Sequence, residues 1–151
     1  MKDIFKNLFY IFLPITIGFV ISVIIRNSIN YSDYIKPPLS PAGFLFPIVW
    51  TILYILMGIS YYLLNKNSNP NTKTKFIYYS QLLVNSLWSI IFFLFKLKLL
   101  SVLWIIILVI LITLMISNFY DYNKTSAYLN IPYLLWCLFA TYLTVGIYIL
   151  N

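Results

Sequence analysis

The chain has 151 residues, of which 62% are hydrophobic and 9% are charged, and its mean hydropathy is +0.92. Soluble globular proteins carry about 25% charged residues, so this composition excludes a water-soluble domain and indicates a protein surrounded by membrane lipid. The net charge of +7 is spread over the chain without a basic cluster on one element. This spread is typical of contacts with anionic lipid headgroups and predicts no nucleic-acid partner.

Five segments of the chain contain no Asp, Glu, Lys or Arg. They are residues 7–25, 37–65, 76–95, 99–120 and 125–151. A helix that crosses the hydrocarbon core of a bilayer needs roughly 20 mostly apolar residues, and each segment is long enough to supply them. The apolar residues are continuous rather than alternating, which favours helices over the strands of a membrane barrel.

The sequence therefore predicts an all-α fold, an integral membrane bundle of five transmembrane helices that forms a single domain over residues 1–151. We expect the helices near residues 7–26, 43–64, 75–95, 99–119 and 129–149. The longest connection is predicted at residues 27–42, and it contains three prolines.

Several kinds of chemistry are excluded by residues that the chain lacks. It has no His, no Glu and a single cysteine, Cys137, so it offers neither an ordinary metal-ligand set nor a His-based catalytic triad. Its three acidic residues, Asp3, Asp33 and Asp121, are predicted at helix ends or in loops, where they form no carboxylate relay across the membrane. We expect no metal, no resident cofactor and no conventional catalytic residue.

Helical spacing brings aromatic, amide and small residues together on four of the expected helices. Side chains three or four residues apart share a helix face, and such faces commonly serve helix packing. The residues are Pro14, Gly18 and Ser22 on the first helix, Pro47, Trp50, Tyr54, Met57 and Tyr61 on the second, Gln81, Asn85, Trp88 and Ser89 on the third, and Pro132, Trp136 and Ala140 on the fifth. Spacing alone thus indicates a five-helix membrane protein with a candidate aromatic pocket.

Three motifs resemble the TspO/MBR family, which includes bacterial tryptophan-rich sensory proteins and the mitochondrial translocator protein, or peripheral benzodiazepine receptor. The first is KPPLSP at residues 36–41 followed by FPIVWTILYILMG at residues 46–58. The second is NSLWS at residues 85–89, and the third is PYLLWCLFATYL at residues 132–143. The motifs occur in the family's order, and the resemblance spans roughly residues 5–151.

The resemblance implies a five-helix bundle, a homodimer, and a pocket for protoporphyrin IX or another flat hydrophobic small molecule, with residues 27–42 as its lid. Carried over by motif, the ligand-binding residues would be Tyr31, Trp50, Asn85, Trp88, Trp136 and Ala140. The flat faces of the indoles suit stacking on a macrocycle. The chain departs from the family's cholesterol motif, which needs a Lys or Arg after a Tyr, because it reads Tyr148-Ile149-Leu150-Asn151 here.

The function expected from the resemblance is tetrapyrrole binding in sensing or transport, in a bacterial cytoplasmic membrane. Two alternatives remain open. One is an enzyme that breaks down porphyrin in light, with Trp50 and Trp136 as its redox partners. The other is a structural or regulatory membrane partner with an incidental pocket.

Overall fold

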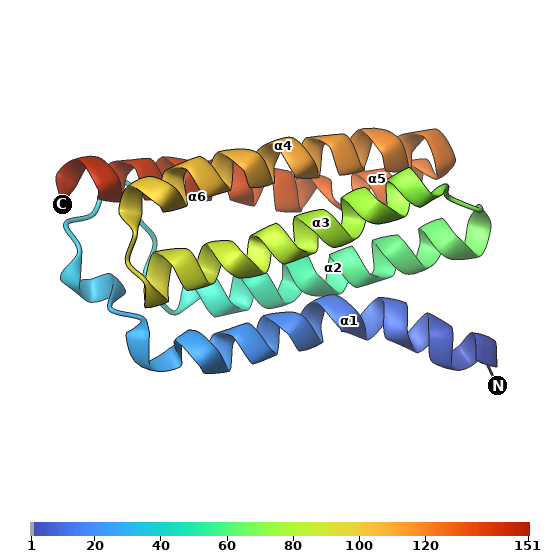
Figure 1. Cartoon of the computed structure of the whole chain (residues 1–151), viewed down its shortest axis with the longest axis horizontal. Helices are drawn as coiled ribbons and strands as arrows, with labels where there is room; N and C mark the ends of the chain where they lie inside the picture. Colours follow the sequence, from blue (N-terminus) through green and yellow to red (C-terminus); the bar gives the residue numbers. More distant parts are fainter. Residues whose placement is uncertain (1) are drawn as a thin grey trace.

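The computed structural model describes residues 2–151 and confirms the all-α prediction. Five helices in this part of the chain are long and apolar enough to cross a membrane, and they run side by side along the longest dimension of the molecule (Figure 1). In chain order the elements are α1 (Lys2–Ile25), the short 3-10 helices η1 (Arg26–Ser28) and η2 (Tyr31–Asp33), α2 (Leu45–Asn67), α3 (Thr72–Ser89), a π-helical turn η3 (Ile90–Leu94), α4 (Lys98–Tyr122), α5 (Lys124–Tyr128) and α6 (Ile131–Leu150).

The helix expected near residues 129–149 corresponds to α6, and the short helix α5 precedes it, with a break between the two at residues 129 and 130. The break falls before Pro132, which lies in the first turn of α6 and has no backbone N–H to donate. The Asn130 side chain bridges the break by donating to the Ser126 carbonyl at 2.9 Å and to the Ser60 hydroxyl at 2.6 Å. The break is thus tied to α2.

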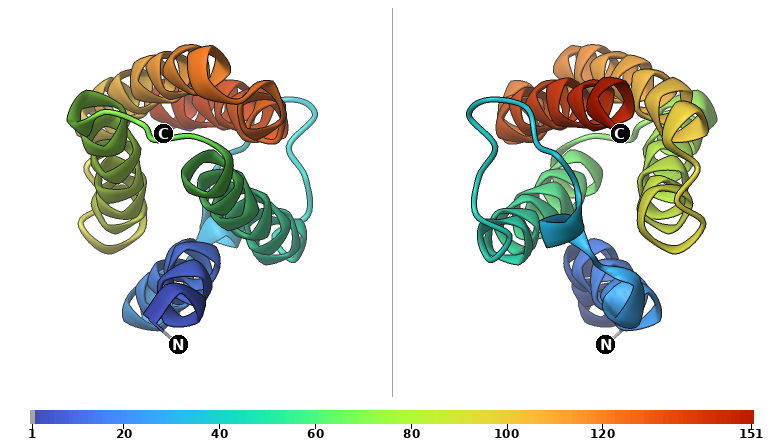
Figure 2. Two further views of the ribbon diagram at one scale, coloured as in Figure 1. Left: turned by 90° about the vertical axis from the view of Figure 1, so that its right-hand side faces the viewer. Right: turned by 90° about the vertical axis from the view of Figure 1, so that its left-hand side faces the viewer.

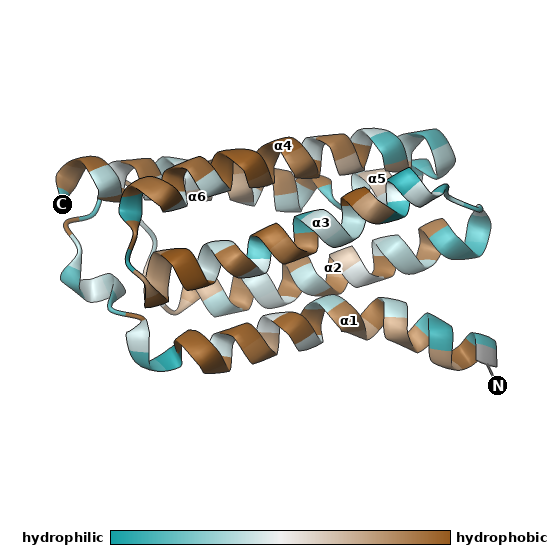
Figure 3. Ribbon diagram, in the orientation of Figure 1, coloured by the Kyte–Doolittle hydropathy of each residue, from teal (hydrophilic) through white to brown (hydrophobic). Residues whose placement is uncertain are grey.

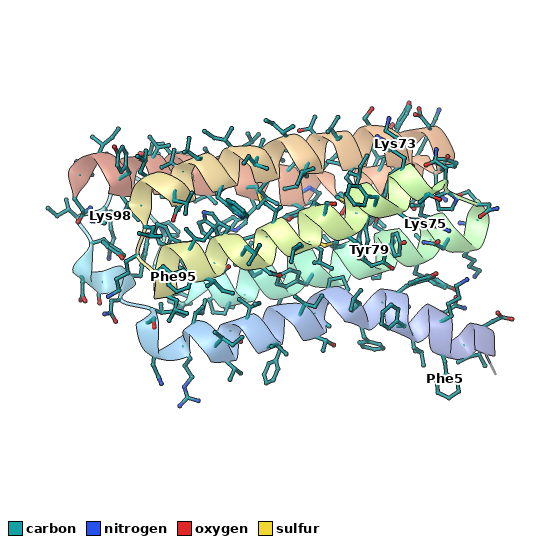
Figure 4. The ribbon with its side chains drawn as sticks, viewed as in Figure 1. Phe5, Lys73, Lys75, Tyr79, Phe95 and Lys98 are labelled. Atoms are coloured by element: carbon teal, nitrogen blue, oxygen red, sulfur yellow. The ribbon has the colours of Figure 1, made fainter. Side chains whose placement is uncertain are left out.

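Hydropathy and charge are distributed as expected for a protein that crosses a bilayer. The middle parts of α1, α4 and α6 are strongly hydrophobic, whereas polar residues gather toward the helix ends and in the connections (Figure 3). Lys73 and Lys75 lie at one end of the bundle, and Lys98 lies at the other (Figure 4). Lysines at both ends suit contact with headgroups on both sides of a membrane.

The five long helices do not contribute equally to the interior of the bundle. Seen end-on, α1 lies at the periphery, next to α2 and away from α4 and α6 (Figure 2). In the apolar part of each membrane-spanning helix, 11% of the residues are buried in the first helix, α1, and 50% are buried in the third helix, α3. Most of the α1 surface is therefore left for lipid, and α3 carries much of the core.

The contact between α1 and α2 depends on a glycine. A Cβ atom added to Gly58 on α2 would overlap the backbone carbonyl of Ile11 on α1. Small residues permit this close approach of backbones, which is a common way for membrane helices to associate. A larger residue at position 58 would force the two helices apart.

We therefore expect Gly58→Ala to destabilise the folded protein by about 1–3 kcal/mol, the usual cost of overpacking a tight contact. Unfolding in mixed detergent micelles would measure the change. Gly43→Ala is the matched control, because a Cβ at position 43 would meet Tyr31 at an ordinary distance of 3.7 Å. Equal stability of the two variants would contradict the importance of this contact.

Candidate functional site

A cavity of about 460 Å³ opens between α1, α2, the end of α3, and α6, on the side of the bundle where residues 27–42 connect α1 to α2. Its volume lies within the range of roughly 300–1,000 Å³ that is usual for small-molecule sites. The lining residues are Gly18, Ile21, Ser22, Ile25, Ile29, Tyr31, Ser32, Lys36, Gly43, Phe46, Pro47, Trp50, Tyr54, Trp88, Ser89, Phe93, Trp136 and Ala140. The cavity therefore has a mostly apolar and strongly aromatic wall.

Five of the six residues expected at the ligand site come together in this wall. They are Tyr31 from η2, Trp50 from α2, Trp88 from α3, and Trp136 and Ala140 from α6. Residues far apart in the sequence thus share one cavity. Asn85 is not part of the lining: it is fully buried in α3, behind the wall.

Asn85 belongs to a hydrogen-bonded cluster in the middle of the bundle. Its amide donates to the Tyr133 hydroxyl at 2.8 Å, and the Tyr133 hydroxyl donates to the Gln81 side-chain oxygen at 2.8 Å. The Tyr54 hydroxyl donates to the Asn85 oxygen at 3.4 Å. Because an unpaired polar group in a membrane interior is costly, these bonds fix the facing sides of α2, α3 and α6. Asn85 therefore reaches the cavity wall through Tyr54 rather than directly.

Aromatic rings brace one another around the cavity. Phe46 lies between Tyr31 and Trp136, with ring centroids 5.0 Å and 5.9 Å away and steep interplanar angles. Trp50 lies 5.5 Å from the Tyr54 ring. The two contacts of Phe46 are edge-to-face, an arrangement that is favourable and directional, so they hold these rings in defined orientations. The wall is therefore largely preformed.

Other lining residues were not expected at the site from the sequence. Gly18 and Ser22 were interpreted as a packing seam on α1, yet both line the cavity. A Cβ at position 18 would overlap the Tyr54 ring, so glycine here makes room for that ring. The four-residue spacing of Gly18 and Ser22 was the available signal, but spacing alone does not distinguish a packing face from a cavity wall.

Comparison with known proteins agrees with this architecture. The sequence profile of the TspO/MBR family matches residues 10–150. The tryptophan-rich protein TspO of Archaeoglobus fulgidus is 38% identical to this chain in an alignment that covers 99% of this chain and 99% of that protein. The chain belongs to the TspO/MBR family.

More distant relatives carry functional names. The tryptophan-rich sensory protein of Cereibacter sphaeroides is 27% identical over 74% of this chain and 70% of its own length. The translocator protein homolog of Schizosaccharomyces pombe is 26% identical over 92% of this chain and 88% of its own length. Family membership and the five apolar helices identify an integral membrane protein with a general role in sensing or transport.

The cavity wall combines side chains that only donate hydrogen bonds, such as Lys36 and the indoles, with hydroxyl groups that both donate and accept. Among residues 2–151, Lys36 is the one charged residue that lines the cavity. Its ammonium group lies 4.7 Å from the centroid of the Tyr31 ring. The Tyr31 hydroxyl and the indole N–H groups of Trp88 and Trp136 are buried and have no hydrogen-bond partner among residues 2–151. These three groups are closed off from the open part of the cavity, so the polar feature that the wall offers to a ligand is the positive charge of Lys36.

Asp33 lies beside the cavity on the same connection but is not part of the lining. Its neighbour Tyr34 is partly buried, and this burial raises the pKa of the Tyr34 phenol, with the Asp33 carboxylate adding to the shift. The phenol therefore stays neutral at physiological pH. The positive charge of Lys36 is therefore the charge that the cavity wall presents to a ligand.

Ala140 is a point where the cavity has little spare room. It is 4% exposed and packs in one cluster with Tyr31 and Trp88. Ala140→Leu would place a branched side chain in this space, so we expect ligand affinity to fall by about 1–3 kcal/mol while the bundle stays folded. Ligand titration would measure the loss. Ala42→Leu, in the exposed connection before α2, is the matched control, and equal affinity of the two variants would contradict this role of Ala140.

Proposed function

We propose that this chain binds protoporphyrin IX, or a closely related flat tetrapyrrole, as part of its role in sensing or transport. The observation that carries the proposal is the cavity of about 460 Å³ in which Trp50, Trp88 and Trp136 meet. Indole rings pack well against a flat aromatic macrocycle, because their faces offer a large apolar area and favourable ring contacts. The family's sensory and translocator members support a role of this kind.

Charge in the wall supports the same class of ligand. Protoporphyrin IX carries two carboxylates, and the Lys36 ammonium is placed to attract one of them at the connection between α1 and α2. An ammonium group also donates hydrogen bonds to carboxylate oxygens. A carboxylate accepts such bonds well, and a charged partner strengthens them.

Titration in the dark tests the proposal. Purified protein in detergent micelles or lipid nanodiscs is mixed with increasing protoporphyrin IX, and the tryptophan fluorescence is followed. We expect saturable quenching with a one-to-one stoichiometry, since three of the four tryptophans line the cavity. Quenching that rises without saturation, as it would for porphyrin dissolved in the micelle, would overturn the proposal.

We also propose a homodimer, as the family resemblance implies. Membrane helices that are apolar on their outer faces associate through packing rather than through water exclusion, so two bundles can pair without a large polar interface. The mass of the detergent-solubilised protein, measured by light scattering, tests this point. A monomer at all protein-to-detergent ratios would contradict it.

A further inference from the structure

The connection of residues 27–42, called the lid loop here, forms part of the cavity wall and is also attached to the far side of the bundle. Tyr31, Ser32 and Lys36 of the lid loop line the cavity. From the end of α1 the chain passes toward the C-terminal end of α6 and then returns to α2 (Figure 2, right). The position of this wall therefore depends on what holds the loop at α6.

The side chain of Asn151, which follows α6, makes two hydrogen bonds to the lid loop. Its oxygen accepts from the backbone N–H of Ile35 at 2.9 Å, and its amide nitrogen donates to the backbone carbonyl of Ile35 at 2.9 Å. The second amide hydrogen serves the Ile147 carbonyl in α6, at 3.0 Å. One side chain thus satisfies both backbone groups of Ile35 and fixes them to the helix. Ile35 directly precedes the cavity residue Lys36.

Two further residues, Lys98 and Tyr142, hold the same region. The Lys98 ammonium, at the start of α4, donates to the Asn151 backbone carbonyl at 3.2 Å and lies 5.4 Å from the centroid of the Tyr34 ring. Lys98 lies at the end of the bundle that the lid loop crosses (Figure 4). The Tyr142 hydroxyl of α6 donates to the Pro38 carbonyl at 2.7 Å. Residues 34–38 are therefore held by both α4 and α6.

The lid loop also packs closely on the helix. Pro37 is buried, and a Cβ atom added to Gly146 of α6 would lie 2.5 Å from Cγ of Pro37. Proline is rigid, so it could not move aside as a flexible side chain would. Glycine at position 146 thus allows the loop to approach α6 at the point between its two hydrogen-bonded attachments.

We propose that Asn151 is the positioning residue that keeps the lid loop closed over the cavity, and that it thereby sets how long a bound ligand is retained. Gly146 and Lys98 act with it, the first by close packing and the second by its bond to Asn151. The part of this proposal that concerns retention rests on the proposed function. Asn151 itself does not line the cavity, so its effect reaches the ligand through Ile35 and Lys36.

Asn151→Ala tests the proposal because it removes both bonds to Ile35 and leaves the backbone carbonyl that Lys98 contacts. Two readouts are measured in the full-length protein: hydrogen exchange of a peptide that covers the lid loop, without ligand, and the dissociation rate of protoporphyrin IX. We expect both to rise roughly five- to thirty-fold, as the loss of two ordinary hydrogen bonds implies. Circular dichroism should show an unchanged helix content.

A matched control and a second variant make the test specific. Asn118→Ala removes a side-chain amide that donates to the Leu114 carbonyl within α4, at the opposite end of the bundle, and should change neither readout. Gly146→Ala should loosen the lid loop as Asn151→Ala does, although alanine is the better helix former. Faster exchange in the lid loop of Gly146→Ala would therefore be caused by the lost close contact with Pro37 and not by a change in helix propensity.

Faster exchange in the lid loop of Asn151→Ala, with unchanged ligand dissociation, would overturn the retention role. Unchanged exchange would overturn the attachment itself. Failure of the unsubstituted protein to bind protoporphyrin IX would overturn the proposed function together with the retention role. Hydrogen exchange, which needs no ligand, would then still decide whether Asn151 holds the loop.

Discussion

Replacing Trp50 and Trp136 together by alanine is expected to weaken protoporphyrin IX binding by about 2–3 kcal/mol, roughly 30- to 150-fold in the dissociation constant. The two indoles come from α2 and α6, and both line the same cavity. The loss arises because each indole supplies apolar contact area and a ring contact to the macrocycle, and alanine supplies neither. Titration in the dark, followed by porphyrin absorbance, measures it without relying on the removed fluorophores.

The double variant needs a control that removes two aromatic side chains from the outside of the bundle. Phe9→Ala combined with Phe12→Ala meets this need, because both side chains are exposed on α1 and neither lines the cavity. Helix content and the unfolding midpoint should be measured for both double variants. Equal affinity of the two double variants would show that the ligand binds elsewhere, even if the unsubstituted protein binds it well.

Much of this fold could be predicted from the sequence because the membrane imposes a simple rule. A backbone in hydrocarbon must satisfy its hydrogen bonds internally, so charge-free segments of about 20 residues become helices. The same rule does not predict local breaks. The break between α5 and α6 could not be predicted in this way, because Asn130 ties it to Ser60 on another helix.

The candidate site could be predicted where the motifs of the family resemblance include its residues. The tryptophans at positions 50, 88 and 136 were expected in one pocket, and all three line the cavity. Asn85 was expected to face the ligand, but its contacts with Tyr133 and Tyr54 place it behind the wall. An amide side chain in a membrane helix turns toward its hydrogen-bond partners on other helices. The spacing of residues within one helix does not show where those partners lie.

The lid loop shows the same limit more clearly. Its prolines indicated a stiff connection, and the resemblance implied a lid, but the residue that attaches it is 116 positions away from Ile35. Asn151 carries no local pattern that distinguishes it from an ordinary polar residue at the end of a helix. Only the folded arrangement reveals that its amide matches both backbone groups of Ile35.

Any breakdown of bound porphyrin is expected to require light and oxygen. The chain has no His and no Glu to act as a general acid or base near neutral pH, whereas an excited porphyrin supplies its own driving force. A porphyrin bound in this cavity would lie beside the indoles of its wall, where the oxygen species formed by the excited porphyrin would reach them. We therefore expect no loss of porphyrin absorbance in the dark, and a loss under illumination that depends on Trp50 or Trp136.

Conservative variants separate this photochemistry from simple binding. Trp50→Phe and Trp136→Phe keep an aromatic ring in the wall but are harder to oxidise, so the ligand should still bind while its loss in light slows. Trp104→Phe is the matched control, because its indole donates to the Val84 carbonyl at 3.0 Å and does not line the cavity. Removal of oxygen should stop the loss in every variant. Steady dark turnover by protein shown to be free of contaminating enzymes would contradict this expectation, since it would require a catalytic group other than the indoles.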